Sequence, residues 1–305
     1  MSWPAYLDLY ESGELDRRAK AASELLRSCE LCPRACGKDR SAGQLGECHT
    51  GRLARVAGAG PHHGEEPCLR GRRGSGTIFF SGCGLGCLFC QNWGISHGRP
   101  GPEIDAPGLA AVMLDLQAEG CHNINLVTPS HVVPQILAAL PQAVGHGLRA
   151  PLVYNTSAYD SLAALRLLED VVDIYMPDFK YWSPTLAERF LTARDYPEVA
   201  RRSLTEMYRQ VGDLALDSRG LARRGLLVRH LVMPEGLAES AAIARWLAAL
   251  SPDTYLNVMA QYRPEGRAAC ESLRSEPIGR ATTSREHAAA LSCARAAGLW
   301  RAEAA

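Results

Sequence analysis

The sequence predicts an α/β protein whose sheet is mainly parallel and forms an open or partial barrel. The chain has 305 residues, of which 47% are hydrophobic, so it is long enough to bury a sizeable core. From residue 76 onward, apolar runs typical of β-strands alternate with segments of helical periodicity. Six such runs are visible, and the chain has little room for the further strands that a complete eight-stranded barrel needs.

The predicted elements follow one another in a regular order. Strand-like runs occupy residues 77–82, 123–128, 151–156, 171–178, 225–233 and 254–260. Helical spacing fills the intervals at 107–120, 133–147, 161–170, 184–211 and 240–250, and a last helix is predicted at 284–297. Gly120 ends the first of these helices, and Pro141 predicts a kink in the second. Each of the first five helices therefore connects two strands that run in the same direction.

The first 75 residues differ from the rest of the chain. They contain one predicted helix, at residues 15–26, followed by loops rich in glycine, cysteine and charge. We therefore divide the chain into a cysteine-rich N-terminal extension, residues 1–75, and an α/β unit, residues 76–305. The polar stretch 61–67 is predicted to be a solvated loop, with the lining of a substrate entrance as the alternative.

Charge and composition exclude several classes of protein. The formal net charge is zero, which gives no electrostatic case for nucleic acid or an anionic membrane as the main partner. No apolar run of about 18 residues predicts a membrane span, and no secretory signal is recognised, so we expect a cytoplasmic protein. Seven of the eleven cysteines fall into two groups before residue 91, which favours metal binding over disulfides.

The segment SGCGLGCLFCQNWG, residues 81–94, carries Cys83, Cys87 and Cys90 directly after the first predicted strand. The spacing is C-x3-C-x2-C, and the intervening glycines allow the backbone to wrap closely around a ligand. Three thiolates can hold three irons of a [4Fe–4S] cubane, which leaves the fourth iron open to an outside ligand. Three buried or redox-active thiols are the alternative interpretation.

A second group of cysteines forms a complete four-ligand set: Cys29, Cys32, Cys36 and Cys48. Zinc would act there as a staple for a loop-rich segment, whereas a [4Fe–4S] cluster could carry electrons. The spacing does not choose between the two metals. The remaining cysteines stand alone, and lone cysteines are usually buried small hydrophobes; they are Cys68, Cys121, Cys270 and Cys293.

Polar residues follow the predicted strands at their carboxyl ends, where the chemistry of parallel sheets is located. After the second, third and fourth strands these are Thr128, Ser130, His131, Asn155, Thr156, Asp178 and Lys180. Their placement on consecutive strands predicts one site shared with the three-cysteine loop. Two simpler interpretations stay open: Ser130 as the N-cap of the following helix, and Asp178 with Lys180 as a surface ion pair.

The three-cysteine loop resembles the signature of the radical S-adenosylmethionine (SAM) enzymes, and the resemblance covers about residues 76 to 262. It implies a partial (β/α)6 barrel with a [4Fe–4S] cluster on Cys83, Cys87 and Cys90, and SAM as the ligand of the fourth iron. It also implies that the reduced cluster cleaves SAM to methionine and a 5′-deoxyadenosyl radical, which abstracts a hydrogen atom from the substrate.

Within that superfamily, the chain is most similar to pyruvate formate-lyase activating-enzyme-like proteins. Phe89 stands where the family has an aromatic residue near the adenine of SAM, and Asn92 follows the third cysteine where activating enzymes often have His-Asn. VTPSH (127–131) replaces the family's Gly-Gly-Glu, so the contacts implied there are Thr128, Ser130 and His131.

The later strand ends also resemble the activating enzymes. YNTS (154–157) resembles their Asp-Thr-Asn-Gly, so Asn155 and Thr156 are implied contacts, although the missing acid leaves a monovalent cation in doubt. MPDFK (176–180) resembles Met-x-Asp-x-Lys, which implies Asp178 for the amino group of SAM and Lys180 for its carboxylate. From the last two strands the implied contacts are Arg229, His230 and Gln261, with a satisfied core histidine as the alternative for His230.

The resemblance implies an oxidoreductase that needs a low-potential electron donor such as flavodoxin or ferredoxin. Its implied substrate is a backbone glycine of a partner enzyme, which becomes a glycyl radical. Another protein or peptide, a nucleic-acid base or a small metabolite stays open, although the neutral charge disfavours RNA. An alternative of a different class is a non-enzymatic iron–sulfur protein that stores or relays electrons, but such a carrier gains nothing from an open iron.

Overall fold

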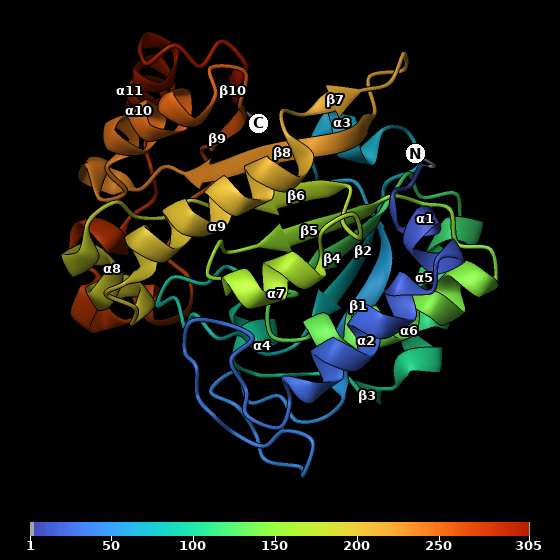
Figure 1. Cartoon of the computed structure of the whole chain (residues 1–305). Helices are drawn as coiled ribbons and strands as arrows, with labels where there is room; N and C mark the ends of the chain where they lie inside the picture. Colours follow the sequence, from blue (N-terminus) through green and yellow to red (C-terminus); the bar gives the residue numbers. More distant parts are fainter. Residues whose placement is uncertain (1–2, 305) are drawn as a thin grey trace.

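A sheet of parallel strands forms the middle of the molecule in the computed structural model, which describes residues 3–304 (Figure 1). Six parallel strands lie side by side in the order of the sequence. They are β2 (Ser75–Phe80), β4 (Ile124–Val127), β5 (Leu152–Thr156), β6 (Ile174–Pro177), β8 (Ala222–Leu231) and β9 (Tyr255–Met259). The α/β class and all six predicted strands are therefore confirmed.

Four further strands make the sheet mixed and leave it open at both ends. They are β1 (Ala54–His62), β3 (Glu103–Ile104), β7 (Ala215–Leu216) and β10 (Ala302–Ala304). The first three run antiparallel to their neighbours, and β10 runs parallel to β9. The sequence did not predict them, because β1 (ARVAGAGPH) is rich in glycine and alanine and the others are too short to show a pattern.

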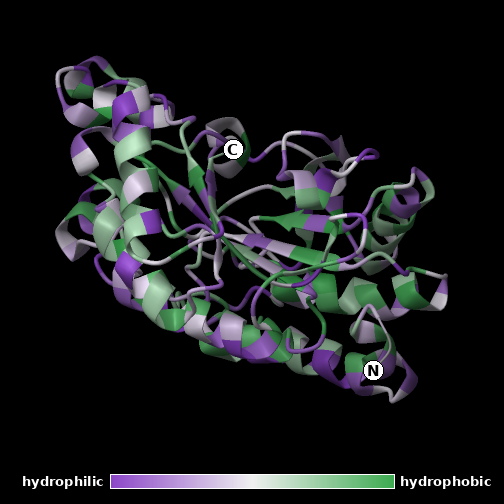
Figure 2. Ribbon diagram, turned by 90° about the horizontal axis from the view of Figure 1, so that it is seen from above, coloured by the Kyte–Doolittle hydropathy of each residue, from purple (hydrophilic) through white to green (hydrophobic). Residues whose placement is uncertain are grey.

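The helices that connect the strands lie along the outside of the sheet (Figure 2). They are α5 (Ala106–Ala118), α6 (Val133–Gly145), α7 (Leu162–Leu167), α8 (Pro184–Leu191), α9 (Tyr196–Val211), α10 (Ser240–Leu250) and α11 (Ser284–Ala296). The predicted helix 184–211 is two helices, because Thr192 adopts a left-handed φ of 56°. α6 runs through Pro141 without interruption.

The remaining helices are short or lie near the N-terminus. They are α1 (Tyr6–Glu11), α2 (Glu14–Glu24), α3 (Pro67–Arg70), α4 (Trp93–Ser96), and the 3-10 turns η1 (Pro234–Gly236), η2 (Gly266–Ala269), η3 (Glu271–Leu273) and η4 (Pro277–Gly279). α2 lies against α6, and Tyr6 and Leu15 belong to the same core as the strands (Figure 1). The division of the chain at residue 75 stays a prediction. Among residues 3–304, no helix is both long and apolar enough to cross a membrane.

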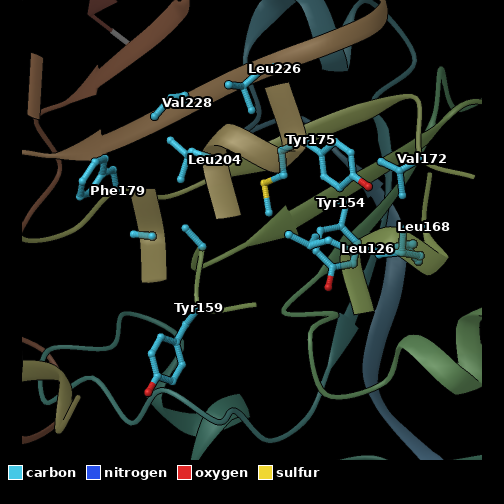
Figure 3. Packing of buried hydrophobic residues seen from close by; sticks show 14 of the residues in the cluster. Leu126, Tyr154, Tyr159, Leu168, Val172, Tyr175, Phe179, Leu204, Leu226 and Val228 are labelled. Atoms are coloured by element: carbon cyan, nitrogen blue, oxygen red, sulfur yellow. The ribbon is translucent and has the colours of Figure 1, made fainter. Parts of the chain in front are cut away.

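The two faces of the sheet differ in chemistry, because alternate residues of a strand point to opposite sides. The side packed under the helices, which we call the helix face, is apolar. Figure 3 shows Leu126, Tyr154 and Tyr175 from the strands together with Leu168 and Leu204 from the helical layer. This continuous core holds the carboxyl ends of the strands in fixed positions.

The opposite side, which we call the polar face, carries Thr77, Asn125, Asn155, Arg229 and Asn257. Nearer the amino ends of the strands this side is apolar, and Cys68 and Leu69 of α3 pack against it in a separate cluster with Val153, Ile174, Met176, Leu227 and Tyr255. The polar residues therefore lie between this apolar cluster and the carboxyl ends of the strands.

Candidate functional site

The three-cysteine loop begins where β2 ends, and two of its glycines shape the backbone. Gly82 and Gly86 have φ angles of +86° and +75°, in the left-handed region that glycine adopts without strain. A side chain at Gly82 would also lie 2.5 Å from the carbonyl oxygen of Cys48. The loop is therefore packed tightly against the segment that carries Cys29, Cys32, Cys36 and Cys48, which we call the four-cysteine segment.

The thiols of Cys83, Cys87 and Cys90 influence one another in this loop. Burial raises the pKa of Cys83 and of Cys87, and the charge of Cys90 adds to both effects. The amide of Leu85 donates a hydrogen bond to Cys83 Sγ (3.4 Å), and the hydroxyl of Ser96 donates one to Cys90 Sγ (3.3 Å). Such donors stabilise a thiolate, which is the form of cysteine that binds a metal.

The thiols are not yet placed as ligands of a common ion. Within residues 3–304, no group of three or more His, Cys, Asp or Glu side chains is arranged to hold a metal.

Lys180 and Asp178 follow β6 and lie beside the three-cysteine loop. Lys180 Nζ is 2.5 Å from Asp178 Oδ2, and both side chains are mostly buried. Burial alone lowers the pKa of Lys180, but Asp178 and Cys87 raise it more, so this pKa lies above its ordinary value. The hydroxyl of Tyr196 donates to the carbonyl of Asp178 (2.8 Å) and accepts from the amide of Lys180 (2.9 Å). The ion pair of the simpler interpretation is therefore present at the strand end, although both of its side chains are partly buried.

Phe89 is buried among tyrosines next to the loop. The rings of Tyr181 and Tyr262 meet it edge-on, with centroid distances of 5.9 and 6.0 Å. The hydroxyl of Tyr262 donates to a backbone carbonyl, but the buried hydroxyl of Tyr181 has no partner among the described residues. A buried phenol usually finds a partner, so Tyr181 offers an unused hydrogen bond near Cys87.

Thr128 directly follows β4 in a backbone conformation that is rare for a β-branched residue. Its φ is 60°, and its amide donates a hydrogen bond to the carbonyl of Asn155 on β5 (2.9 Å). Strain of this kind persists only where the surroundings enforce it, and it is common at functional sites. Thr128 and Asn155 are both partly exposed, so their side chains are accessible at neighbouring strand ends.

Ser130 and Thr156 belong to a buried network around Asp160. Thr156 Oγ1 donates to Asp160 Oδ2 (2.6 Å), the hydroxyl of Tyr154 donates to Asp160 Oδ1 (2.8 Å), and Ser130 Oγ lies 3.0 Å from Thr156 Oγ1. Ser130 does not cap α6, whose N-cap is Val132, so that alternative is wrong. The two hydroxyls therefore support the strand ends from the side of the helix face.

His131 lies directly under the start of the three-cysteine loop. Burial is the main reason that its pKa falls to about 4, and the charge of Arg40 adds to the effect. The imidazole is therefore neutral at pH 7, and because its Nε2 lies 3.0 Å from the carbonyl of Ser81, that nitrogen carries the proton. His131 supports the backbone just before Gly82.

Arg229 points to the polar face but is engaged in a buried ion cluster. It donates to Glu66 Oε1 (2.8 Å) and Oε2 (2.6 Å) and also pairs with Glu65. The amide of Asn257 donates to Glu66 as well (2.6 Å). Glu65 and Glu66 are only 8% and 4% exposed, so the prediction that 61–67 forms a solvated loop is wrong for these two residues. The expected contact of Arg229 with SAM stays a prediction, although its guanidinium already has these partners.

His230 lies on the helix face and is a satisfied core histidine. Its Nδ1 is 2.8 Å from the carbonyl of Phe179, and its Nε2 is 2.8 Å from Ser240 Oγ. This arrangement is the alternative interpretation of His230, and it places the ring away from the polar face. Asn92 and Gln261 are exposed at the rim of the loop.

The four-cysteine segment packs on the same loop. Arg34, between the second and third of its cysteines, donates to the carbonyls of Gly84 (2.7 Å), Leu85 (2.9 Å) and Thr192 (2.7 Å). A side chain at Gly84 would lie 3.1 Å from Cys32 Sγ. Arg34 therefore joins the N-terminal extension to the three-cysteine loop and to the break between α8 and α9.

The thiols within the four-cysteine segment influence one another. Burial raises the pKa of Cys32 to about 12, and the thiols with the strongest effect on it are Cys48 and Cys29.

Of the lone cysteines, Cys68 and Cys121 are buried as expected, whereas the expectation of burial is wrong for the two exposed residues, Cys270 and Cys293.

Several residues of this region were not predicted, among them Arg34, Glu65, Glu66, Asp160 and Tyr181. Arg34 and Tyr181 had a usable signal, because one lies inside a cysteine group and the other follows the MPDFK segment. The glutamates had none, since their partner Arg229 is 163 residues further along the chain from Glu66.

Fold and site together define an α/β protein with a thiol-rich centre at the carboxyl ends of its parallel strands. No family model matches the sequence. A protein of Methanocaldococcus jannaschii, Uncharacterized protein MJ0674, is 28% identical over 269 residues, which cover 86% of this chain and 74% of that protein. The name of that protein states no activity.

Proposed function

We propose that this chain is a radical SAM enzyme of the activating-enzyme-like group and that its open sheet is a partial barrel. One observation carries the proposal. Three thiols of spacing C-x3-C-x2-C occupy a glycine-shaped loop at the end of the first parallel strand, beside the partly buried pair of Lys180 and Asp178. The sequential order of the six parallel strands, with helices outside them, supports the barrel.

The residues present fit a [4Fe–4S] cluster held by Cys83, Cys87 and Cys90. They provide three soft thiolate donors on one loop, and the donors from Leu85 and Ser96 would remain for the sulfur atoms. When bound, the reduced cluster would supply the electron that cleaves SAM, and the resulting 5′-deoxyadenosyl radical would take a hydrogen atom from the substrate.

The residues around the loop would bind and orient SAM. Lys180 would pair with its carboxylate, and Asp178 would accept hydrogen bonds from its amino group. Thr128 and Asn155 would add polar contacts at the neighbouring strand ends. Because the Lys180 ammonium already lies beside an acid and a thiol, it is fixed in place before a ligand arrives.

The aromatic residues beside the loop would keep water away from the reactive centre. Phe89, Tyr181 and Tyr262 form a wall with edge-on ring contacts, and the unused hydroxyl of Tyr181 would donate to the bound ligand. A low-potential flavodoxin or ferredoxin would deliver the electron. The substrate proposed by resemblance is a backbone glycine of a partner enzyme.

The test is the production of 5′-deoxyadenosine. The chain is purified without oxygen, reconstituted with iron and sulfide, reduced with dithionite and incubated with SAM. We expect 5′-deoxyadenosine from the wild type and none from Cys83→Ala, Cys87→Ala or Cys90→Ala. Cys270→Ala is the matched control, because that thiol is exposed and lies outside both cysteine groups. An intact cluster that yields no 5′-deoxyadenosine would favour the electron-carrier alternative and overturn the proposal.

A further inference from the structure

Arg40 is a fully buried cation without an anionic partner. Its exposed fraction is 0%, and among residues 3–304 no carboxylate lies within ion-pair distance of it. Its Nε donates to the carbonyl of Gly51 (3.1 Å), and Nη1 donates to the carbonyl of His131 (2.8 Å). Its Nη2 is buried and has no hydrogen-bond partner in the described part of the chain.

Such a cation requires an anion nearby. A guanidinium keeps its proton in proteins, so it cannot become neutral as a buried lysine can. Burial of an unpaired charge costs several kcal/mol even after the surroundings relax. Neutral carbonyls satisfy two of its nitrogens but do not cancel its charge.

The groups that surround Arg40 are the thiols of the four-cysteine segment. Arg40 Nη1 lies 3.6 Å from Cys29 Sγ. A side chain at Gly46 would lie 3.3 Å from Cys48 Sγ, 3.5 Å from Cys36 Sγ and 3.7 Å from Arg40 Cδ, so these two thiols and the Arg40 side chain all surround one point. The charge of Arg40 also lowers the pKa of Cys48, against the larger effect of burial, which raises it. As thiols these groups are neutral, and as a disulfide they would be neutral too.

Two hydrogen-bonded loops bring these cysteines together. The amide of Gly37 donates to the carbonyl of Cys29 (3.1 Å), and the amide of Cys29 donates to the carbonyl of Lys38 (3.1 Å). In the second loop, the amide of Gly46 donates to the carbonyl of Thr50 (3.2 Å). These backbone hydrogen bonds hold the segments that carry the cysteines close to one another.

We propose that Cys29, Cys32, Cys36 and Cys48 bind a thiophilic metal centre as four thiolates, and that Arg40 is its buried counter-cation. A zinc ion or an oxidised [4Fe–4S] cluster with four thiolates keeps a net negative charge, which is the charge that Arg40 lacks. The free Nη2 group is then available as a donor to a metal-bound sulfur. Because Arg34 and Cys32 contact the three-cysteine loop, this centre also fixes the wall against which that loop packs.

The first experiment measures the zinc and iron content of a chain whose three-cysteine loop can no longer bind a metal. In a Cys83→Ser, Cys87→Ser, Cys90→Ser background, purified without oxygen, we expect either about one zinc or about four irons per chain. Zinc identifies a staple, and iron with labile sulfide identifies a cluster. Adding Cys29→Ser and Cys48→Ser removes the metal, whereas adding Cys270→Ser leaves it. A background chain that binds neither metal after reconstitution overturns the proposal, whatever the outcome of the SAM assay.

The second experiment tests the charge of Arg40 in the otherwise unchanged chain. We compare the thermal midpoints of wild type, Arg40→Met and Arg40→Lys before and after a chelator removes the metal. We expect Arg40→Met to bind the metal about tenfold more weakly or worse, since a hydrogen bond to a charged group is lost, and Arg40→Lys to recover part of the affinity. Metal-free Arg40→Met should unfold no earlier than metal-free wild type, because it no longer buries an unpaired charge. A loss of stability that is equal with and without metal would show a purely structural arginine and overturn its assignment as counter-cation.

Discussion

Lys180 lies between the carboxylate of Asp178 and the thiol of Cys87, and burial and charge act on its ammonium in opposite directions. We predict that Lys180→Met raises the KM for SAM about 10- to 100-fold, because a charge-assisted hydrogen bond to the ligand is lost. Steady-state formation of 5′-deoxyadenosine measures this, with iron content as the check on the cluster. The exposed Lys20 provides the matched control, Lys20→Met. An unchanged KM with full iron content would show that Lys180 does not meet SAM.

Arg229 forms ion pairs with two buried carboxylates, those of Glu65 and Glu66, so its loss should be costly. Burial alone raises the pKa of Glu66, but Arg229 outweighs it, and the pKa lies below its ordinary value. We predict that Arg229→Met lowers the free energy of unfolding at pH 7 by about 3–5 kcal/mol, since the buried glutamates lose their partner. Arg229→Lys should recover part of this loss.

The same variant should reverse the pH dependence of stability that Glu66 contributes. In the wild type the lowered pKa means that this contribution is present above the unfolded-state value of about 4.5 and is lost as the pH falls through the folded value. In Arg229→Met, burial without the arginine raises the pKa, so the variant should regain stability between pH 7 and pH 5. Urea unfolding at both pH values measures the difference, and an equal loss at both would contradict the assignment.

At the scale of the elements, the turn after β4 contains strain that a single substitution can relieve. Thr128 has a φ of 60°, which glycine adopts freely and alanine does not. We predict that Thr128→Gly is more stable than Thr128→Ala by about 1 kcal/mol, because only the glycine relieves the strain. Thermal unfolding measures the difference. If Thr128 also contacts SAM, both variants should raise KM, and Thr128→Ser should not.

The elements that the sequence predicted are those whose pattern is local. The six parallel strands are continuous apolar runs, and their helices have clear spacing, so both are visible without tertiary information. β1 was missed because its glycines and alanines have low strand propensity, and pairing with β2 stabilises it instead. The predicted helix 184–211 is broken at Thr192, where Arg34 binds the backbone carbonyl from a distant segment.

In the candidate site, too, only the features with a local sequence pattern could be predicted. The cysteines and the polar strand ends were found because spacing and strand order are local signals. The contacts of Arg40, Arg229 and His230 depend on which face of the sheet a side chain occupies and on partners far away in the chain. Such partners cannot be read from the sequence of a single chain, and they decide whether a polar residue meets a ligand or another residue.

At the scale of the whole molecule, the N-terminal extension and the α/β unit share one sheet and one core. β1 pairs with β2 over most of its length, and Glu65 and Glu66 supply the carboxylates that Arg229 requires. Tyr6 donates a hydrogen bond to the carbonyl of Ala150 (2.8 Å), so even the first helix is tied to the start of β5. Strand pairing, ion pairs and core packing therefore all cross the predicted boundary at residue 75.

We predict that a chain of residues 76–305 does not fold by itself. It would leave Arg229 buried without an acid and expose the edge of β2, and exposed edges of this kind favour aggregation. Solubility and the cooperativity of thermal unfolding measure the outcome. A chain that begins at residue 13 is the control, because it loses α1 but keeps β1 and both glutamates; it should unfold cooperatively at a lower midpoint than the full chain. Cooperative unfolding of 76–305 at the midpoint of the full chain would instead establish two independent domains, and the coupling of the cysteine groups through Arg34 would then lie at an interface between them.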